Sequence, residues 1–249
     1  MNASRRIALA LIAAPLSLGL AACNGDAEGG EVAEGEALDP IAAPEGQQWT
    51  DLVQATDEEG YLLGNPDAPI KLIEYGSFTC GACASFVQNG VDELKEDYVN
   101  TGLVSFELRN FDRNGIDTTI SSIVRCGPDE IFHPLADQVW TNFDTVMTGV
   151  QSAQLEGVEN LPENQRWVAV ASETGLLDFF ASRGISRNQA ATCLADADAV
   201  QGLSERTNTT ADELGVTGTP TFFVNGNRVD GTTWDVLEPV LQRAGARSE

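Results

Sequence analysis

A strand, a Cys-x-x-Cys pair and an amphipathic helix follow one another between residues 70 and 98. The segment Ile70–Tyr75 is rich in β-branched and apolar residues, which predicts a strand. Apolar residues then recur every three or four positions from Cys83 to Tyr98, which predicts one face of a helix. Cys80 and Cys83 therefore fall where a strand ends and a helix begins. No other feature of the chain constrains its fold and chemistry as strongly.

A cysteine pair in this position is suited to redox chemistry. The unpaired N–H groups and the positive dipole end of a helix N-terminus stabilise a thiolate at Cys80. Such an environment lowers the pKa of a thiol from about 8.5 to roughly 3.5–7.5, which makes the thiol a nucleophile near neutral pH. Cys83, one helical turn later, can then resolve the mixed disulfide that Cys80 forms.

The alternative for these two cysteines is half of a zinc site. Structural zinc needs four ligands, usually from a second Cys-x-x-Cys pair or from two spaced histidines. The chain has no second pair, and its single histidine is His133. We expect this histidine to lie at the start of a helix rather than to act in catalysis. The sequence therefore predicts a redox-active disulfide between Cys80 and Cys83, and no metal site.

The charge and the remaining motifs narrow the function classes further. The net charge of −24 argues against a nucleic-acid partner, because a nucleic-acid groove is basic. Neither a nucleotide-binding loop nor a nucleophilic serine elbow is present in the sequence. We expect no cofactor, since the two cysteines can carry the electrons themselves.

The N-terminus has the layout of an export signal. Arg5 and Arg6 precede a mostly apolar run, Ile7–Leu20, that is too short for a confident membrane-spanning helix. The ending Leu-Ala-Ala-Cys at Cys23 resembles the lipobox of bacterial lipoproteins, which implies removal of residues 1–22 and lipidation of Cys23. We therefore expect a lipid-anchored protein in the periplasm or cell envelope of a Gram-negative bacterium. The alternative is an ordinary signal peptide cut nearby, which leaves Cys23 as a free thiol.

Three further segments complete the expected organisation. Residues 23–48 are rich in Gly, Ala and Glu without an apolar period, which predicts an acidic, disordered tether before a domain that begins at Trp49. Strands are expected at Tyr61–Leu63 and Val104–Arg109, and only helical patterns occur from about 117 to 214. A strand at Thr221–Val224, a hairpin turn and a closing helix follow. The fold class expected is α/β, a mixed sheet flanked by helices with an inserted all-helical block.

This order of elements resembles the thioredoxin fold, and in particular the DsbA-like thiol–disulfide oxidoreductases of bacterial envelopes. The matching motifs are Glu74–Gly76 before the cysteine pair, the pair itself, and Gly218–Phe222 after the helical block. The resemblance covers residues 49–246. It implies that Cys80 attacks, that Cys83 resolves, and that Thr219 and Pro220 form a cis-proline loop that binds the substrate backbone. The alternative for Pro220 is a turn proline before a strand.

Glu74 matches a buried acid that relays protons to the resolving cysteine in this family. Because side chains alternate along a strand, Glu74 shares a face with Ile70 and Leu72, and an acid on an apolar face is often functional. The alternative is an exposed acid on the strand. Cys126 and Cys193 are expected to form a structural disulfide in an oxidising compartment, and the alternative is two buried free thiols.

Three functions follow, of which the first is favoured. The chain is expected to donate disulfides to unfolded or cysteine-containing envelope proteins, with a membrane redox partner such as a DsbB-like oxidase or a reductase. Strongly oxidising members of the family carry a histidine between the cysteines, whereas this chain has Gly81 and Ala82, which implies a weaker oxidant. A thiol reductase or isomerase is therefore the second reading. The third is a non-catalytic, lipid-tethered module that binds peptides or a metal.

Overall fold

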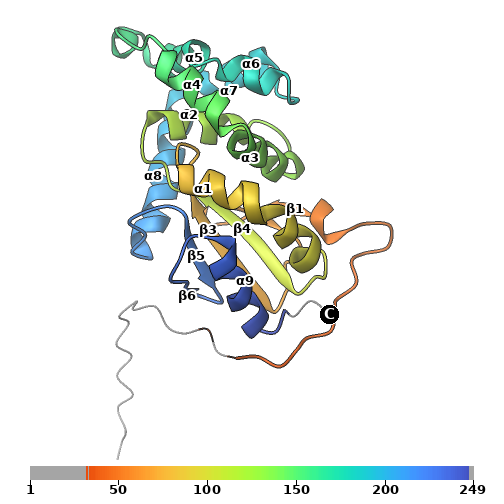
Figure 1. Ribbon diagram of the computed structural model, residues 1–249. Helices are drawn as coiled ribbons and strands as arrows, with labels where there is room; N and C mark the ends of the chain where they lie inside the picture. Colours follow the sequence, from red (N-terminus) through yellow and green to blue (C-terminus); the bar gives the residue numbers. More distant parts are fainter. Residues whose placement is uncertain (1–31, 33, 247–249) are drawn as a thin grey trace, which may run out of the picture.

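The computed structural model describes residue 32 and residues 34–246, and its centre is a six-stranded mixed sheet (Figure 1). The order across the sheet is β1-β2-β4-β3-β5-β6. β3 and β4 are parallel, and every other neighbouring pair is antiparallel. The strands are β1 (Val53–Ala55), β2 (Gly60–Leu63), β3 (Ile70–Gly76), β4 (Val104–Asn110), β5 (Thr221–Val224) and β6 (Asn227–Arg228). The expected fold class, a mixed sheet with flanking helices, is confirmed.

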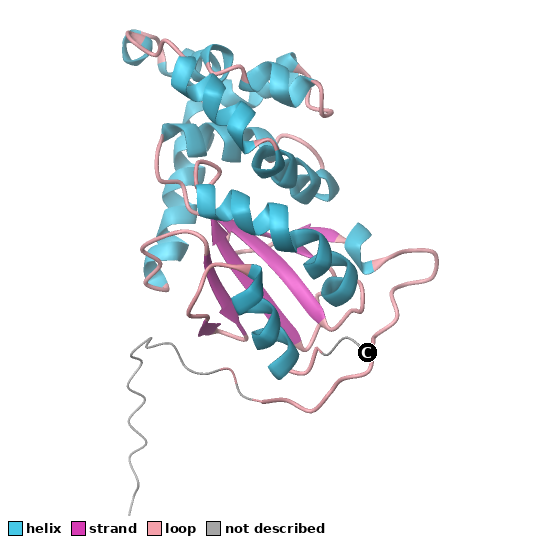
Figure 2. Cartoon of the chain, viewed as in Figure 1, coloured by secondary structure: helices cyan, strands magenta, loops and turns pink. Residues whose placement is uncertain are grey.

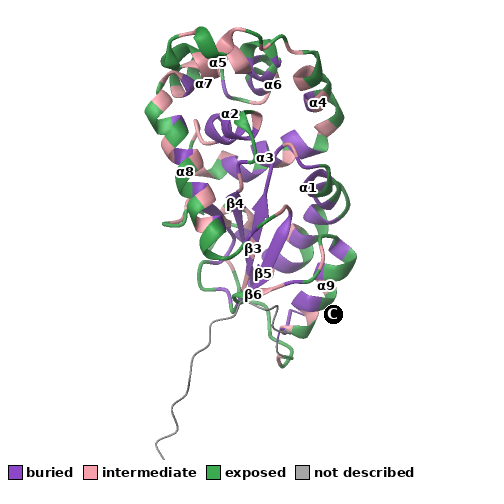
Figure 3. Ribbon diagram, turned by 90° about the vertical axis from the view of Figure 1, so that its left-hand side faces the viewer, coloured by how far each residue is buried: buried purple, intermediate pink, exposed green. Residues whose placement is uncertain are grey.

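The two central strands are covered on both faces. All seven residues of β4 and five of the seven residues of β3 are buried. One face is covered by α9 (Trp234–Arg243) and by the helix that starts as α1 (Gly81–Phe86) and continues through π-helical turns to Val99. This long helix is the crossover that the parallel pair β3–β4 requires. Figure 3 shows the strands buried between the surrounding helices.

The helices between β4 and β5 form the inserted block, which lies together at one end of the molecule (Figure 2). The block begins two residues before the expected start at residue 117. Its last helix, α8, extends back beside the sheet, where Ala211 packs with Tyr75 and Phe223. The helices are α2 (Gly115–Val124), α3 (Phe132–Thr141), α4 (Phe143–Ser152), α5 (Glu163–Glu173), α6 (Leu176–Ala181), α7 (Arg187–Ala195) and α8 (Ala197–Glu213).

The block and the sheet share one apolar core. Trp140 of α3 stacks on Phe78, which follows β3, with ring centroids 4.8 Å apart. Both side chains are almost fully buried. Phe132, at the start of α3, stacks on Tyr61 of β2 at 3.8 Å. Because these contacts join the insertion to the strand before the cysteine pair and to a neighbouring strand, the block is part of the domain that carries the site.

The segment before Trp49 lies along the domain. Residues 34–48 contain no helix or strand, but the backbone N–H groups of Gly35 and Leu38 donate to carbonyl oxygens of Arg243 and Gly245, at 2.7 and 3.1 Å. The N–H of Ile41 donates to Thr101, just before β4, at 2.8 Å. The expected free tether extended to residue 48, whereas the chain is attached from Gly35 onwards. Composition does not reveal backbone hydrogen bonds of this kind.

The predicted signal peptide, the lipidated Cys23 and the start of the tether lie outside the described residues. Within residues 34–246, no helix combines the length and the apolar character needed to cross a membrane.

Candidate functional site

The cysteine pair lies where β3 passes into α1. Cys80 is the N-cap residue of α1, with extended backbone angles, and its carbonyl oxygen accepts the first helical hydrogen bond from the N–H of Ala84 at 3.1 Å. Cys83 lies in the first turn. Both cysteines are free thiols; Cys80 is 7% exposed and Cys83 is fully buried, while Gly81 and Ala82 between them are exposed. A partner molecule therefore reaches the sulfur of Cys80 before that of Cys83.

The loop before β5 lies directly against Cys80. The peptide bond between Thr219 and Pro220 is cis, and the Sγ of Cys80 in its thiol form donates to the carbonyl oxygen of Thr219 at 3.2 Å. The hydroxyl of Thr219 is buried and has no hydrogen-bond partner among the described residues. The two motifs that the sequence places about 140 residues apart thus meet at one sulfur atom.

The two thiols differ strongly in acidity. Hydrogen bonding to the Cys83 side chain, together with the backbone N–H groups of Cys83 and Ala82, outweighs the opposing effect of burial and lowers the pKa of Cys80 to about 5. Burial, then the hydrogen bond to Cys80, raises the pKa of Cys83 well above its ordinary value. At neutral pH, Cys80 is a thiolate and Cys83 is a thiol. The thiolate is stabilised without a histidine, because neighbouring donors replace it.

Glu74 is buried on β3 beneath the pair. It is 1% exposed, and neither carboxyl oxygen has a hydrogen-bond partner in the described part of the chain. Burial, with smaller contributions from the charges of Asp137 and Cys80, raises the pKa of Glu74 to about 8. The charge of Glu74 in turn contributes to the raised pKa of Cys83. The side chain is therefore protonated at neutral pH and is electrostatically coupled to both cysteines.

Two residues of the helical block hold the turn that precedes Cys80, and neither belongs to a local motif. The indole N–H of Trp140 donates to the carbonyl oxygen of Ser77 at 3.1 Å. The carboxylate of Asp117 accepts hydrogen bonds from Ser77 and Thr79. These contacts join residues 38 to 63 positions apart, so the short-range patterns of the sequence could not indicate them.

A hollow of about 360 Å³ lies between α1 and the start of α9. Its lining includes Ser85 and Asn89, which are exposed on the helix that Cys80 begins, and Trp234, whose indole N–H is buried and unpartnered in the described structure. The hollow therefore presents polar side chains along the helix that Cys80 begins.

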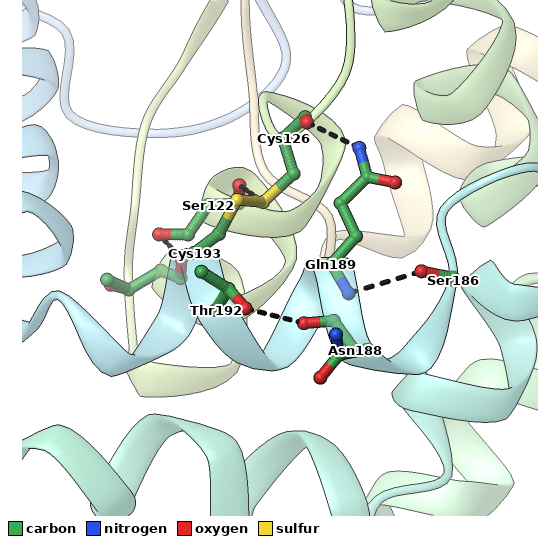
Figure 4. Close-up of a disulfide and its surroundings, with 8 residues drawn as sticks. Ser122, Cys126, Ser186, Asn188, Gln189, Thr192 and Cys193 are labelled. Atoms are coloured by element: carbon green, nitrogen blue, oxygen red, sulfur yellow. Dashed lines mark hydrogen bonds between the residues drawn. A yellow bond between two sulfur atoms is a disulfide. The ribbon is translucent and has the colours of Figure 1, made fainter.

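The other cysteines and the histidine lie in the helical part of the molecule. Cys126, after α2, and Cys193 of α7 form a disulfide with Cα atoms 6.1 Å apart (Figure 4). His133 lies in the first turn of α3, and its Nε2 is 2.9 Å from the carbonyl oxygen of Tyr61. Burial lowers the pKa of His133 to about 3, so this ring is neutral. No group of three or more His, Cys, Asp or Glu within the described ranges could hold a metal ion.

The chain is similar in sequence and in structure to known proteins. A family model described as Thioredoxin matches residues 56–243. The protein-disulfide isomerase from Novosphingobium aromaticivorans is 30% identical, with a TM-score of 0.68 over 78% of this chain and 99% of that chain. The alpha-DsbA1 of Wolbachia pipientis is 22% identical, with a TM-score of 0.59 over 74% and 89% of the two chains, and this likeness shows the fold.

Among curated sequences, the chain is similar to a Rickettsia bellii protein that is named as a protein-disulfide oxidoreductase. It is 25% identical over 193 residues, which cover 76% of this chain and 65% of that protein. The matched region spans 61–65% of the length of the first such relatives, which is less than two thirds.

Proposed function

The chain belongs to the thioredoxin family, and from that membership we propose that it exchanges disulfides with cysteine-containing proteins of the cell envelope, chiefly as a disulfide donor. The observation that carries the proposal is the contact between the Cys80 sulfur and the Thr219–Pro220 loop, together with the unequal acidity of Cys80 and Cys83. The relative from Novosphingobium supports the same chemical class.

The proposed reaction begins with an oxidised Cys80–Cys83 disulfide. A substrate thiolate attacks the Sγ of Cys80, a substrate–Cys80 disulfide forms, and the Cys80–Cys83 bond breaks. Cys83 leaves as a thiolate and takes a proton. A second substrate thiolate then attacks the substrate sulfur of the mixed disulfide, so a substrate disulfide forms and Cys80 leaves as a thiolate. Two electrons pass from the substrate to the protein; one substrate proton ends on Cys83 and the other in solvent.

The surrounding residues have assigned roles in this proposal. Glu74, protonated near neutral pH, supplies the proton that Cys83 takes and recovers one from solvent. Thr219 and Pro220 bind the substrate backbone beside the reacting sulfur. The hollow between α1 and α9 receives the adjoining part of the substrate chain. The disulfide between Cys126 and Cys193 has a structural role.

The donor direction is supported by the pKa of Cys80. A thiol of low pKa is a good leaving group, and a stabilised thiolate favours the reduced form of the protein, which makes the disulfide oxidising. A pKa of about 5 lies between the values of about 7 for thioredoxin and about 3.5 for strongly oxidising DsbA. The Gly81-Ala82 dipeptide supports the second candidate, a reductase or isomerase of the same fold. A non-catalytic binding module, the third reading, does not need two thiols of such different acidity.

The proposed setting is the bacterial envelope, with a lipid anchor at Cys23 and a membrane redox partner. The attachment of residues 35–41 supports a defined orientation. Ile41 is bonded to Thr101, before the start of β4, whereas Cys80 follows the far end of β3, which is parallel to β4. An anchor at the N-terminus would therefore hold the cysteine pair at the end of the sheet away from the membrane.

The test compares two single variants, Cys80→Ser and Cys83→Ser, with the unmodified protein. Cys80→Ser is expected to lose oxidation of a dithiol peptide and reduction of insulin, because no attacking sulfur remains. Cys83→Ser is expected to accumulate a stable mixed disulfide at Cys80, visible by mass spectrometry. Full activity in Cys80→Ser would contradict the proposal.

The direction of exchange is decided by equilibrating the Cys80–Cys83 couple with glutathione buffers. A reduction potential near −120 mV would support the donor, and one near −270 mV would support the reductase.

A further inference from the structure

Asp117 lies in the first turn of α2, at the entrance to the helical block, and is fully buried. Its Oδ1 accepts hydrogen bonds from the backbone N–H of Thr79 at 2.8 Å and from the hydroxyl of Ser77 at 3.0 Å. Its Oδ2 accepts from the hydroxyls of Thr79 at 3.1 Å and Ser77 at 3.0 Å. One carboxylate from the insertion thus binds both polar residues of the turn that leads into Cys80.

The same carboxylate is also held from its own helix. The backbone N–H of Arg113 and the side-chain amide of Asn114 donate to its Oδ2, at 3.0 and 3.2 Å. Each oxygen therefore faces an N–H group that can only donate, which favours the ionised form of Asp117. Burial raises its pKa, and the hydrogen bonds from Thr79 and Arg113 oppose that rise. Its charge also lies within the positive end of the α2 dipole.

The held turn determines where Cys80 sits. The carbonyl oxygen of Ser77 accepts the N–H of Cys80 at 3.1 Å, and Cys80 is the N-cap of α1. In that position the sulfur accepts hydrogen bonds from the backbone N–H groups of Ala82 and Cys83. Any rotation of the Ser77–Thr79 turn would move the N-cap residue relative to these two donors.

We infer that Asp117 is a positioning residue for the reaction: by binding Ser77 and Thr79 it keeps Cys80 at the N-terminus of α1, with its sulfur against the backbone donors of the first turn. The inserted block therefore contributes directly to the reactivity of a cysteine on the thioredoxin frame. This inference rests on the proposed role of Cys80 as the attacking cysteine.

The test measures the acidity of Cys80 in the full chain, from the pH dependence of alkylation by iodoacetamide, read on the peptide that contains Cys80. In Asp117→Asn, an NH₂ group replaces one carboxylate oxygen. This NH₂ group faces N–H and O–H donors and cannot accept their hydrogen bonds, so the turn should loosen. The midpoint of the alkylation profile is expected to rise by about one pH unit, a tenfold loss of thiolate below the midpoint.

The matched control is Asp112→Asn. Asp112 is another buried acid at the entrance to the block. Its carboxylate accepts a hydrogen bond from Ser121 at 2.6 Å, and within the described residues it makes no hydrogen bond to Ser77 or Thr79. Its replacement should leave the Cys80 midpoint unchanged. A midpoint in folded Asp117→Asn that equals that of the unmodified protein would overturn the inference, whatever the loss of stability.

Thr79→Val provides a second route should Asp117→Asn not fold. This variant keeps the Thr79 N–H bond to Asp117 but loses the hydroxyl bonds, so a smaller rise in the midpoint is expected. An unchanged midpoint in Thr79→Val would then overturn the inference. Failure of the proposed function is a separate result: it appears as an ordinary midpoint near 8.5 in the unmodified protein.

Discussion

At the scale of single residues, chemically similar groups of the site have different pKa values because their surroundings differ. Cys80 and Cys83 are three positions apart, yet one thiol lies at a helix N-terminus against several donors and the other is sealed in the core. The same contrast separates two buried acids. Asp117 is surrounded by donors, whereas Glu74 has none among the described residues. Burial raises the pKa of both acids, and hydrogen bonds from neighbouring donors oppose that rise at Asp117.

The isolation of Glu74 predicts a pH-dependent cost to stability. Its pKa is about 8 in the folded protein and about 4.5 when unfolded, so stability is fully present below pH 4.5 and declines as the pH rises towards 8. Glu74→Gln removes this dependence. We compare the free energy of unfolding of Glu74→Gln with that of the unmodified protein at each pH. This difference is expected to be roughly 2–3 kcal/mol more favourable to the variant at pH 7 than at pH 4.5.

Urea unfolding of both proteins at pH 4.5 and pH 7 measures that gain. Exchange activity should fall in the same variant, because glutamine cannot pass a proton to Cys83. A stability difference that stays constant between the two pH values would show that Glu74 titrates normally.

At the scale of elements, the helical block has contacts with the thioredoxin-like part of the domain and also cross-links between its own helices. The disulfide between Cys126 and Cys193 joins the end of α2 to α7 across 67 positions of sequence. The side-chain amide of Gln189 adds a hydrogen bond to the carbonyl oxygen of Cys126 at 2.8 Å (Figure 4). Both of these contacts lie inside the block, whereas Asp117 and Trp140 bind the Ser77–Thr79 turn that precedes Cys80.

Removing the disulfide should therefore weaken the fold more than the chemistry. For the double variant Cys126→Ala/Cys193→Ala, closure of a loop of this length predicts a loss of up to about 4 kcal/mol in the free energy of unfolding. Urea unfolding measures the loss, and the alkylation midpoint of Cys80 is the internal control, expected to stay constant. An unchanged urea midpoint would contradict a structural role for this disulfide.

At the scale of the whole molecule, the net charge of −24 should select among substrates by long-range attraction. Oxidation of a dithiol peptide rich in lysine is expected to be several-fold faster at 10 mM than at 200 mM salt, because the screening length falls from about 30 Å to below 10 Å. An acidic peptide of equal length should show the opposite trend. Stopped-flow rates that are independent of salt for both peptides would exclude this steering.

Much of the architecture follows from patterns within short windows of sequence. Residues 70–75, 80–98 and 104–109 carry the patterns that predict a strand, a helix and a strand, and the structure has all three, with each strand one residue longer. The helical stretch from 117 to 214 is equally local, since turns of a helix involve neighbours only. The short strand β1 was not expected, because Val53–Ala55 lies at the sheet edge, is mostly exposed and contains no apolar run.

The sequence by itself thus determined the thioredoxin-like order of elements and the cysteine pair at a helix N-terminus. The tertiary structure decided what surrounds that pair: the Thr219 carbonyl at the Cys80 sulfur, the unpartnered burial of Glu74, the Asp117 carboxylate on the Ser77–Thr79 turn, and the attachment of the N-terminal segment. The physical reason is range. Periodicity records which face of an element is buried, whereas hydrogen bonds between residues 38 to 139 positions apart exist only once the elements have packed.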